Sequence, residues 1–168
     1  MTPTRSDNKR ILSLRLSQPI DEELLAAVYA DTAQEELSLF AWSAEQKAVF
    51  CLMQFRMQTR AYEMRFPDAE CYVIEHEGQD VGRLLINRGH DEIRLIDVAL
   101  LAKFRNNGLG TILLEDLMEE AQAARKSIGL SVLKTNLNAT RLYEKLGFRS
   151  IDENQTHIAM QWRYRKEK

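Results

Sequence analysis

The sequence predicts an α+β fold, with a three-layer arrangement of helices around one sheet. Apolar residues recur at helical spacing in two segments between residues 21 and 66, and from residue 70 onward the period shifts to two. Glycine and proline separate the segments, so that the predicted order is strand, two helices, three strands, helix, strand, helix and strand.

The first two elements are short and clearly bounded. Residues 11–16 alternate apolar and polar side chains, which predicts a strand that Pro19 ends. Asp21 can cap the helix that follows. The predicted helix has an apolar face, which is formed by Leu24, Leu25, Val28 and Tyr29.

A second, longer helix is predicted between Ser43 and Pro67. Ser43, with Gln46 three residues later, forms the capping-box pattern, and a proline cannot continue a helix. One face of this helix is rich in methionine. We interpret that stripe as core filling, and a deformable pocket wall or a dimer contact is the alternative. The stripe consists of Phe50, Met53, Met57, Ala61 and Met64.

Two hairpins and a final mixed segment complete the predicted fold. Gly78 lies in the first hairpin turn, and Gly147 closes the last helix, which Asn138 caps. A helix with a leucine-rich face follows the predicted strand over residues 92–101. The predicted elements are strands over 72–75, 81–86 and 92–101, the leucine-rich helix, a strand over 128–133, a helix over 138–146 and a strand over 158–164.

The composition is typical of a globular protein, with 45 % hydrophobic and 29 % charged residues among 168. We expect a disordered terminus over residues 1–9 and one domain over residues 10–168. The net charge of −2 gives no reason to expect nucleic-acid or membrane partners. The chain has no signal-peptide pattern and no apolar run of about 20 residues, so we expect a cytoplasmic protein.

Few side chains suggest redox or metal chemistry. Cys51 and Cys71 lie in apolar segments and are expected to act as small core hydrophobes. The three histidines lack the spacing of metal ligands, so we predict no metal site.

The strongest functional signal lies between residues 100 and 111. A strand leads into a loop that carries Arg105, Gly108 and Gly110, and an amphipathic helix follows at once. Glycines at such a point let the backbone approach a ligand, and the free N–H groups of the helix start face an anion. A tight turn that only needs positive φ angles is the alternative.

Together with a second segment, this loop resembles the GNAT superfamily of acyl-CoA-dependent N-acyltransferases. The loop matches the family's pyrophosphate pattern, Gln/Arg-x-x-Gly-x-Gly/Ala, and the resemblance covers about residues 71–162. It implies a GNAT-type three-layer fold, with a central mixed, mostly antiparallel sheet flanked by about four helices. The second pattern, N-x-x-A-x-x-L-Y-x-x-x-G-F, is met at Asn136, Ala139, Leu142, Tyr143, Gly147 and Phe148.

The resemblance implies that acetyl-CoA is the co-substrate. The loop N–H groups would hold the pyrophosphate, and Arg105 either contacts phosphate or only braces the loop. The backbone of the strand before the loop would pair with pantetheine, whereas an ordinary buried strand is the alternative. The implied cofactor-binding residues are Val98, Ala99, Leu100, Arg105, Asn106, Asn107, Gly108, Leu109, Gly110, Thr111 and Asn136.

Two residues are candidates for proton transfer. The resemblance gives Tyr143 the role of proton donor to the departing CoA thiolate, and a packed core aromatic is the alternative. Asp97 is an acidic residue in the middle of an apolar strand, which is unusual unless it is paired. It is either the general base or a structural carboxylate paired with Arg94 or Arg83. Arg94 stands where some family members carry a glutamate base, so the base stays open.

The acceptor-binding part of the chain is less clearly marked. Glu35 and Glu36 are expected between the first two helices, where the family has its acceptor-binding segment. They either attract a cationic amine or are solvated charges at a helix end.

These observations predict an N-acetyltransferase that moves an acetyl group from acetyl-CoA directly to a primary amine. No cysteine lies near the predicted thioester, which argues against a covalent enzyme intermediate. The acceptor is a small-molecule or peptide amine, and a homodimer is left open. One alternative is a non-catalytic CoA-binding module of the same fold that serves assembly or regulation. Another is an interaction protein that uses the methionine-rich helix, but it leaves both motifs unexplained.

Overall fold

The computed structural model describes residues 12–166, which form two compact units. Unit 1 contains the described residues up to Leu85 together with Asp97–Asn107, and unit 2 contains Ile86–Ile96 and the described residues from Gly108 onward. The predicted disorder of residues 1–9 and the first residue of the predicted strand over 11–16 lie outside the described residues. The predicted domain limits stay a prediction.

Seven strands are hydrogen-bonded in the order β1-β2-β3-β4-β5-β7-β6, and the sheet is mixed. The pairs β1–β2, β5–β7 and β6–β7 are antiparallel, whereas β4 and β5 are parallel. The parallel register joins Glu92–Leu95 to Ser127–Leu130, one residue to one. With four α-helices among the described residues, this sheet confirms the predicted α+β class.

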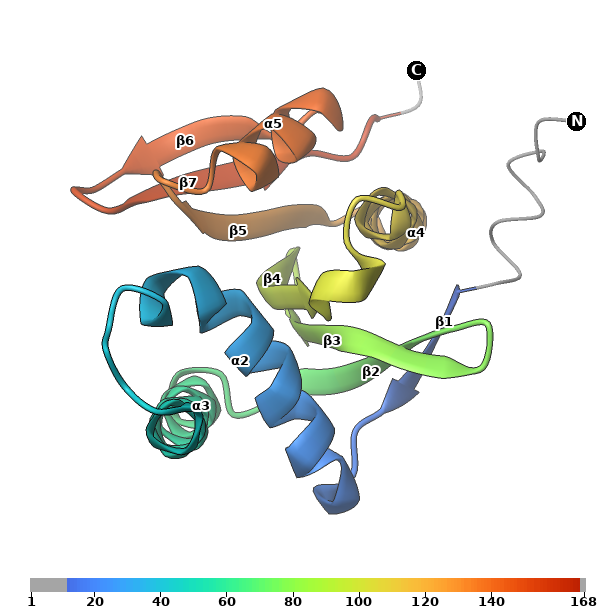
Figure 1. The fold of residues 1–168 in the computed structure, drawn as a ribbon. Coiled ribbons are helices and arrows are strands. Elements are labelled where there is room, and N and C mark those ends of the chain that lie inside the picture. Colours follow the sequence, from blue (N-terminus) through green and yellow to red (C-terminus); the bar gives the residue numbers. More distant parts are fainter. Residues whose placement is uncertain (1–11, 167–168) are drawn as a thin grey trace, which may run out of the picture. The chain divides into compact units, whose positions relative to one another are not determined.

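Unit 1 holds the first helices and the N-terminal strands (Figure 1). Its two long helices begin and end close to the predicted positions, and Ser43 and Gln46 form the predicted capping box. Two strands run through both units, because the division falls after Leu85 and before Asp97. The elements are β1 (Leu12–Leu16), η1 (Pro19–Asp21), α2 (Glu22–Leu37), α3 (Ala44–Arg65), β2 (Glu70–His76), β3 (Gln79–Arg88), β4 (Glu92–Leu100) and η2 (Ala102–Phe104).

The core of unit 1 joins both helices to the sheet. Leu25 from α2, Phe55 from α3 and Val73 from β2 form one buried cluster. Burying side chains of this size contributes about 2 kcal/mol each to folding. Cys51 is buried as predicted, and burial raises the pKa of its thiol, whereas Cys71 is half-buried.

The interpretation of the methionine stripe as core filling is wrong. Met53, Met57 and Met64 are 55, 61 and 78 % exposed. The buried face of α3 carries Cys51 and Phe55 instead. Helical spacing alone shows that residues share a face, but it does not show which face meets the core.

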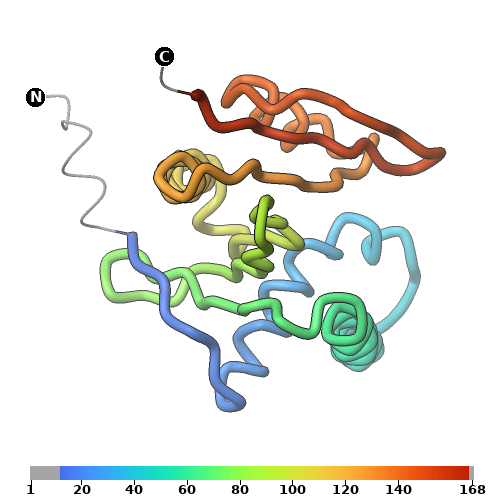
Figure 2. Tube along the Cα trace, turned by 180° about the vertical axis from the view of Figure 1, so that it is seen from behind, coloured from blue at the N-terminus to red at the C-terminus, as the bar shows by residue number. Residues whose placement is uncertain are grey.

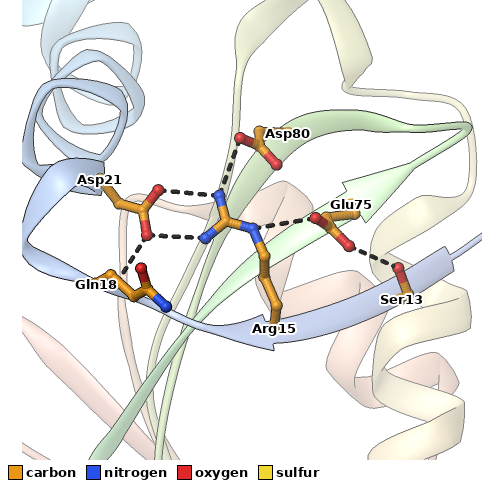
Figure 3. Close-up of polar contacts among 6 residues, drawn as sticks. All are labelled: Ser13, Arg15, Gln18, Asp21, Glu75 and Asp80. Atoms are coloured by element: carbon orange, nitrogen blue, oxygen red, sulfur yellow. Dashed lines mark hydrogen bonds and ion pairs between the residues drawn. The ribbon is translucent and has the colours of Figure 1, made fainter.

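Arg15 ties β1 to three other elements of unit 1 (Figure 3). Its guanidinium donates to both oxygens of Asp21 at 2.8 and 2.9 Å, and to Glu75 and Asp80 at 3.0 Å each. This arrangement lowers the pKa of the Asp21 carboxyl, mainly through its hydrogen bonds with Arg15 and then through the backbone N–H of Gln18. Asp21 therefore anchors the start of α2 through its side chain without the capping bond predicted for it.

Unit 2 holds the C-terminal strands and two helices, which are coloured from yellow to red in Figure 2. Helix α4 packs on β5, and its predicted leucine face is buried at Leu113, Leu114 and Leu117. The elements that lie wholly in this unit are α4 (Leu109–Ala124), β5 (Ser127–Leu133), α5 (Leu137–Lys145), β6 (Arg149–Glu153) and β7 (His157–Trp162).

Two details of unit 2 differ from the sequence predictions. Strand β6 was not predicted, because all five of its residues are exposed and no apolar alternation marks it. Asn138 does not cap α5. Asn136 does so, since its Oδ1 accepts the N–H of Ala139 at 3.2 Å.

Candidate functional site

The loop before α4 has the backbone conformation that its glycine and asparagine allow. Asn106 has φ = 63° in unit 1, and Gly108 has φ = 78° at the N-cap of α4 in unit 2. A Cβ at Gly108 would meet nothing within 4 Å, so glycine is needed there for its φ angle and not for space.

The first turn of α4 leaves backbone donors available. No side chain caps this helix, and its first backbone bond runs from the N–H of Ile112 to the carbonyl of Gly108. The N–H groups of Leu109, Gly110 and Thr111 therefore have no acceptor within residues 12–166. At the positive end of a helix, such donors suit an anion. This arrangement fits the predicted pyrophosphate role.

Arg105 braces the chain beside the loop in unit 1. Its Nε donates to the carbonyl of Leu100 at 3.1 Å, which corresponds to the bracing alternative. Its Nη2 is buried and has no hydrogen-bond partner within the described residues. This nitrogen is therefore unsatisfied within the described residues, and contact with phosphate stays a prediction.

The strand predicted to pair with pantetheine lies close against β3. A Cβ at Gly82 would be 2.3 Å from the Ala99 carbonyl oxygen and 2.8 Å from the Leu100 Cδ2 atom. Leu101 also donates its N–H to the carbonyl of Val81 at 2.9 Å. Gly82 therefore sets the spacing at which Ala99 and Leu100 are held. Val98, Ala99 and Leu100 lie in unit 1, beyond the parallel register described above, and their role stays a prediction.

Asp97 forms an ion pair with Arg83, one of the two partners left open by the sequence. The Arg83 side chain is 6 % exposed and that of Asp97 is 24 % exposed. Arg83 also donates to Gln58 Oε1 at 3.1 Å, and its guanidinium carbon lies 5.6 Å from the centre of the Phe55 ring. Asp97 is thus the counter-charge of a buried cation, and its role as a base stays a prediction.

Two residues near this pair were not predicted from the sequence. Gln58 lies on α3 and accepts a hydrogen bond from Arg83. No sequence pattern distinguishes Gln58 from the other polar residues of that helix. Tyr62 belongs to the same helix, and its pKa is raised, mainly by burial and then by the charge of Asp97, while Arg83 opposes the shift. These side chains make a polar cluster inside unit 1 that only the fold brings together.

Tyr143 lies on α5 in unit 2 and is 8 % exposed. Its ring centre is 5.6 Å from that of Phe148, so the packing alternative describes part of its role. The preceding residue, Leu142, lies beside the loop helix, because a Cβ at Gly110 would be 3.9 Å from Leu142 Cδ2. The two sequence motifs are therefore adjacent in unit 2.

Asn136, Glu35 and Glu36 are the remaining residues with a predicted role. Asn136 uses its Oδ1 to cap α5, and its contact with a cofactor stays a prediction. Glu35 and Glu36 do not lie between the first two helices but in the last turn of α2, where both are exposed. This position agrees with solvated helix-end charges.

The described part of the chain offers neither a cluster of metal ligands nor a helix that could span a membrane. Within residues 12–166, no group of three or more histidine, cysteine or acidic side chains could hold a metal ion. No helix in this range is long and apolar enough to cross a membrane. The cytoplasmic location stays a prediction.

The chain matches one family model. This model describes the acetyltransferase (GNAT) family, and the match spans residues 23–148. A comparison with curated protein sequences gives no significant match.

Solved structures resemble the fold over nearly the whole chain. The PaiA N-acetyltransferase of Thermoplasma acidophilum in complex with coenzyme A has a TM-score of 0.68 at 16 % identity, and the match covers 91 % of this chain and 99 % of that chain. The ribosomal-protein-S18-alanine N-acetyltransferase of Escherichia coli has a TM-score of 0.62 at 20 % identity, with 94 % and 97 % covered. A GNAT family acetyltransferase of Elizabethkingia anophelis with acetyl-CoA bound has a TM-score of 0.59 at 18 % identity, with 94 % and 99 % covered. At such identities the likeness shows the fold, and it confirms the predicted three-layer type.

Proposed function

The chain belongs to the acetyltransferase (GNAT) family, whose co-substrate is acetyl-CoA, and on this premise we propose that it transfers an acetyl group directly to a primary amine. The family match confirms the resemblance and the enzyme class predicted from the sequence. The acceptor, the sequential route and the residue roles are parts of the proposal. Bound acetyl-CoA supplies a thioester whose carbonyl carbon the amine attacks.

The observation that carries the proposal is the start of α4. Three backbone N–H groups in its first turn have no acceptor within residues 12–166, and the N-cap, Gly108, has no Cβ to obstruct an approaching ligand. Pyrophosphate is the anion that this geometry suits. In unit 1, the buried Nη2 of Arg105 has no hydrogen-bond partner among the described residues, and its contact with phosphate is a separate part of the proposal.

Tyr143 is proposed as the proton donor to the departing sulfur. A thiolate is a poorer leaving group than a thiol, so a hydroxyl that donates a proton or a hydrogen bond lowers the barrier. The support is the position of Tyr143 on α5, one residue from the leucine that lies beside the loop glycine Gly110. Burial of the ring against Phe148 fixes its orientation.

Asp97 is proposed to accept the proton that the ammonium group must lose before it attacks. The support is that Asp97 is partly exposed and lies between apolar residues of β4, while Arg83 pairs with one of its oxygens. The ammonium proton would pass to the Asp97 carboxylate either directly or through one water.

The loop is tested by replacing Gly108 with valine. This change strains a positive φ angle and adds bulk beside the free N–H groups, so we expect acetyl-CoA affinity to fall at least tenfold by calorimetry. Gly78→Val is the matched control, because Gly78 has φ = 76°, has equally open surroundings and lies in the β2–β3 turn. Equal acetyl-CoA affinity in the two folded variants would refute the assignment.

Tyr143 is tested by replacing it with phenylalanine, which keeps the ring packed on Phe148. We expect turnover to fall by about a hundredfold while acetyl-CoA affinity is unchanged, because the hydroxyl acts in the transition state. The measurement is single-turnover acetyl transfer to an amine, followed by thiol release. Tyr164→Phe, outside both motifs, is the control. Unchanged single-turnover rates would show that Tyr143 has only a packing role.

A further inference from the structure

One side chain of α2 reaches the turn that precedes the glycine loop. The Oδ2 atom of Asp31 accepts the backbone N–H of Ala102 at 2.8 Å, across 71 residues of sequence. Ala102 is the first residue of η2, and α2 is in contact with η2. All of these residues belong to unit 1. The bond therefore ties the first long helix to the segment between β4 and the loop.

The N–H of Ala102 needs an acceptor from outside the turn. Inside η2, the Phe104 N–H donates to the Leu101 carbonyl at 2.9 Å. The Arg105 N–H donates to the Ala102 carbonyl at 3.2 Å. Both bonds leave the Ala102 N–H without an acceptor in the turn, as at the start of any helix. The N-cap residue, Leu101, makes no side-chain cap bond, so Asp31 supplies the missing cap from another element.

The carboxylate of Asp31 is not engaged by a cation. Within residues 12–166 it forms no ion pair, although its side chain is half-buried. A partly buried charge is unfavourable unless it is hydrogen-bonded, and a hydrogen bond to an ionised acceptor is about twice as strong as a neutral one. The bond to Ala102 therefore compensates for the placement of this charge.

The turn that Asp31 holds leads directly into the predicted pyrophosphate loop. Arg105 is the C-cap of η2, and its buried Nη2 has no hydrogen-bond partner among the described residues. The Leu101 N–H is bonded to Val81 of β3, which fixes the start of the turn from the sheet. Asp31 fixes the same turn from α2. The position of Arg105, and of the loop that continues from it, therefore depends on both anchors.

We propose that Asp31 is a positioning residue for acetyl-CoA binding. Its carboxylate fixes η2 by holding the Ala102 N–H, and η2 sets the place from which Arg105 and the pyrophosphate loop meet the cofactor. Asp31 acts through this turn and not by contact with the cofactor, and it belongs to neither sequence motif. The inference rests on the proposed function, because the loop is the part of that proposal that binds pyrophosphate.

Calorimetric titration of each folded variant with acetyl-CoA tests this role. Asp31→Ala removes the acceptor and keeps a good helix former, so we expect a folded protein whose acetyl-CoA affinity is about fivefold lower. Asp31→Asn keeps an oxygen acceptor at the same place, and its affinity should stay within about twofold of the wild type. Equal affinity of Asp31→Ala and the wild type, or an Asp31→Asn variant as weak as Asp31→Ala, would overturn the inference.

Glu22→Ala is the matched control, because Glu22 also anchors α2 through its carboxylate. Its Oε1 accepts from Arg56 of α3 at 2.6 Å, away from η2. Loss of this bond disturbs the packing of α2 without touching the turn, so acetyl-CoA affinity should be unchanged. A loss of affinity in Glu22→Ala equal to that in Asp31→Ala would show a general effect of α2 packing and would refute the positioning role.

A double-mutant cycle shows whether Asp31 acts through this hydrogen bond. Ala102→Pro removes the N–H, and proline is tolerated at the first position of a helix. In that background Asp31→Ala should change acetyl-CoA affinity by less than about twofold, because the bond is already absent. A further loss of about fivefold there would show that Asp31 acts by another route, which contradicts the inference.

The loop variant Gly108→Val separates the two possible failures. If Gly108→Val weakens acetyl-CoA binding and Asp31→Ala does not, the inference fails while the pyrophosphate assignment stands. If neither change weakens binding, the pyrophosphate assignment fails, and the inference fails with it.

Discussion

Replacing Gly82 with alanine tests the close approach of β3 and β4 at the predicted pantetheine strand. A single added methyl group would lie 2.3 Å from the Ala99 carbonyl oxygen, and real Cβ contacts are essentially never shorter than 3.0 Å. Because the obstacle is backbone, relief requires the strand at Ala99 to move by about 1 Å. Gly82 is buried, and the backbone fixes the direction of an added Cβ, so the methyl group cannot avoid this contact.

The expected cost combines two effects. Overpacking a buried site costs about 2 kcal/mol, and loss of the adjacent bond from the Leu101 N–H to the Val81 carbonyl costs about 1 kcal/mol more. A total of about 3 kcal/mol lowers the melting temperature of a chain of this size by roughly 9 °C. Displacing Ala99 by about 1 Å should also weaken acetyl-CoA binding by about tenfold.

The assay is thermal unfolding of the variant, followed by calorimetric titration with acetyl-CoA below its melting temperature. Gly129→Ala is the matched control in a buried strand, where the three atoms nearest to the added methyl group all belong to the carboxylate of Glu92. That side chain can swing away, so we expect a change below about 1 kcal/mol. An unchanged melting temperature in Gly82→Ala would refute the argument from strand spacing. A destabilised variant with normal acetyl-CoA affinity would remove Ala99 from the predicted site.

Two further predictions concern charges in unit 1. Asp97→Asn should lower the free energy of unfolding by about 3 kcal/mol, because Arg83 then keeps a buried charge without its partner. A large loss of stability with normal turnover in a folded sample would leave Asp97 a structural residue. Asp21, whose pKa is lowered by Arg15, stabilises the fold above the unfolded carboxyl pKa of about 3.9, and this contribution is lost as the pH falls through the folded value. The urea midpoint of Asp21→Asn should therefore fall less than that of the wild type between pH 7 and pH 3, and parallel curves would contradict this.

The sequence predicted best where a local pattern decides the structure. The Ser43–Gln46 capping box, the Gly78 turn and the glycine loop before α4 each depend on a few neighbouring residues, and each is present. Strand alternation disfavours Arg94 as the partner of Asp97, because residues three apart in a regular strand point to opposite faces. The contact with Arg83 depends instead on how β3 lies against β4, and no local signal reports that register.

Other sequence predictions were wrong where the exposure of a residue, and not its type, decides the local structure. Strand β6 is exposed along its whole length, so its pairing with β7 leaves no apolar alternation in the sequence. The α3 methionines have core-like composition and spacing but face outward. Asn136 and Asn138 are both good helix caps, and which one is used depends on where the turn after β5 ends.

Strand β6 also bears on how copies of the protein can associate. It is the last strand of the sheet order, and an outer strand can recruit a strand from another molecule. Arg149, Asp152 and Glu153 place charges along it, and an irregularity between Ser150 and Asp152 interrupts its regular pairing. Both features discourage the addition of a further strand. We therefore expect this edge to resist aggregation, and any self-association to use a different surface.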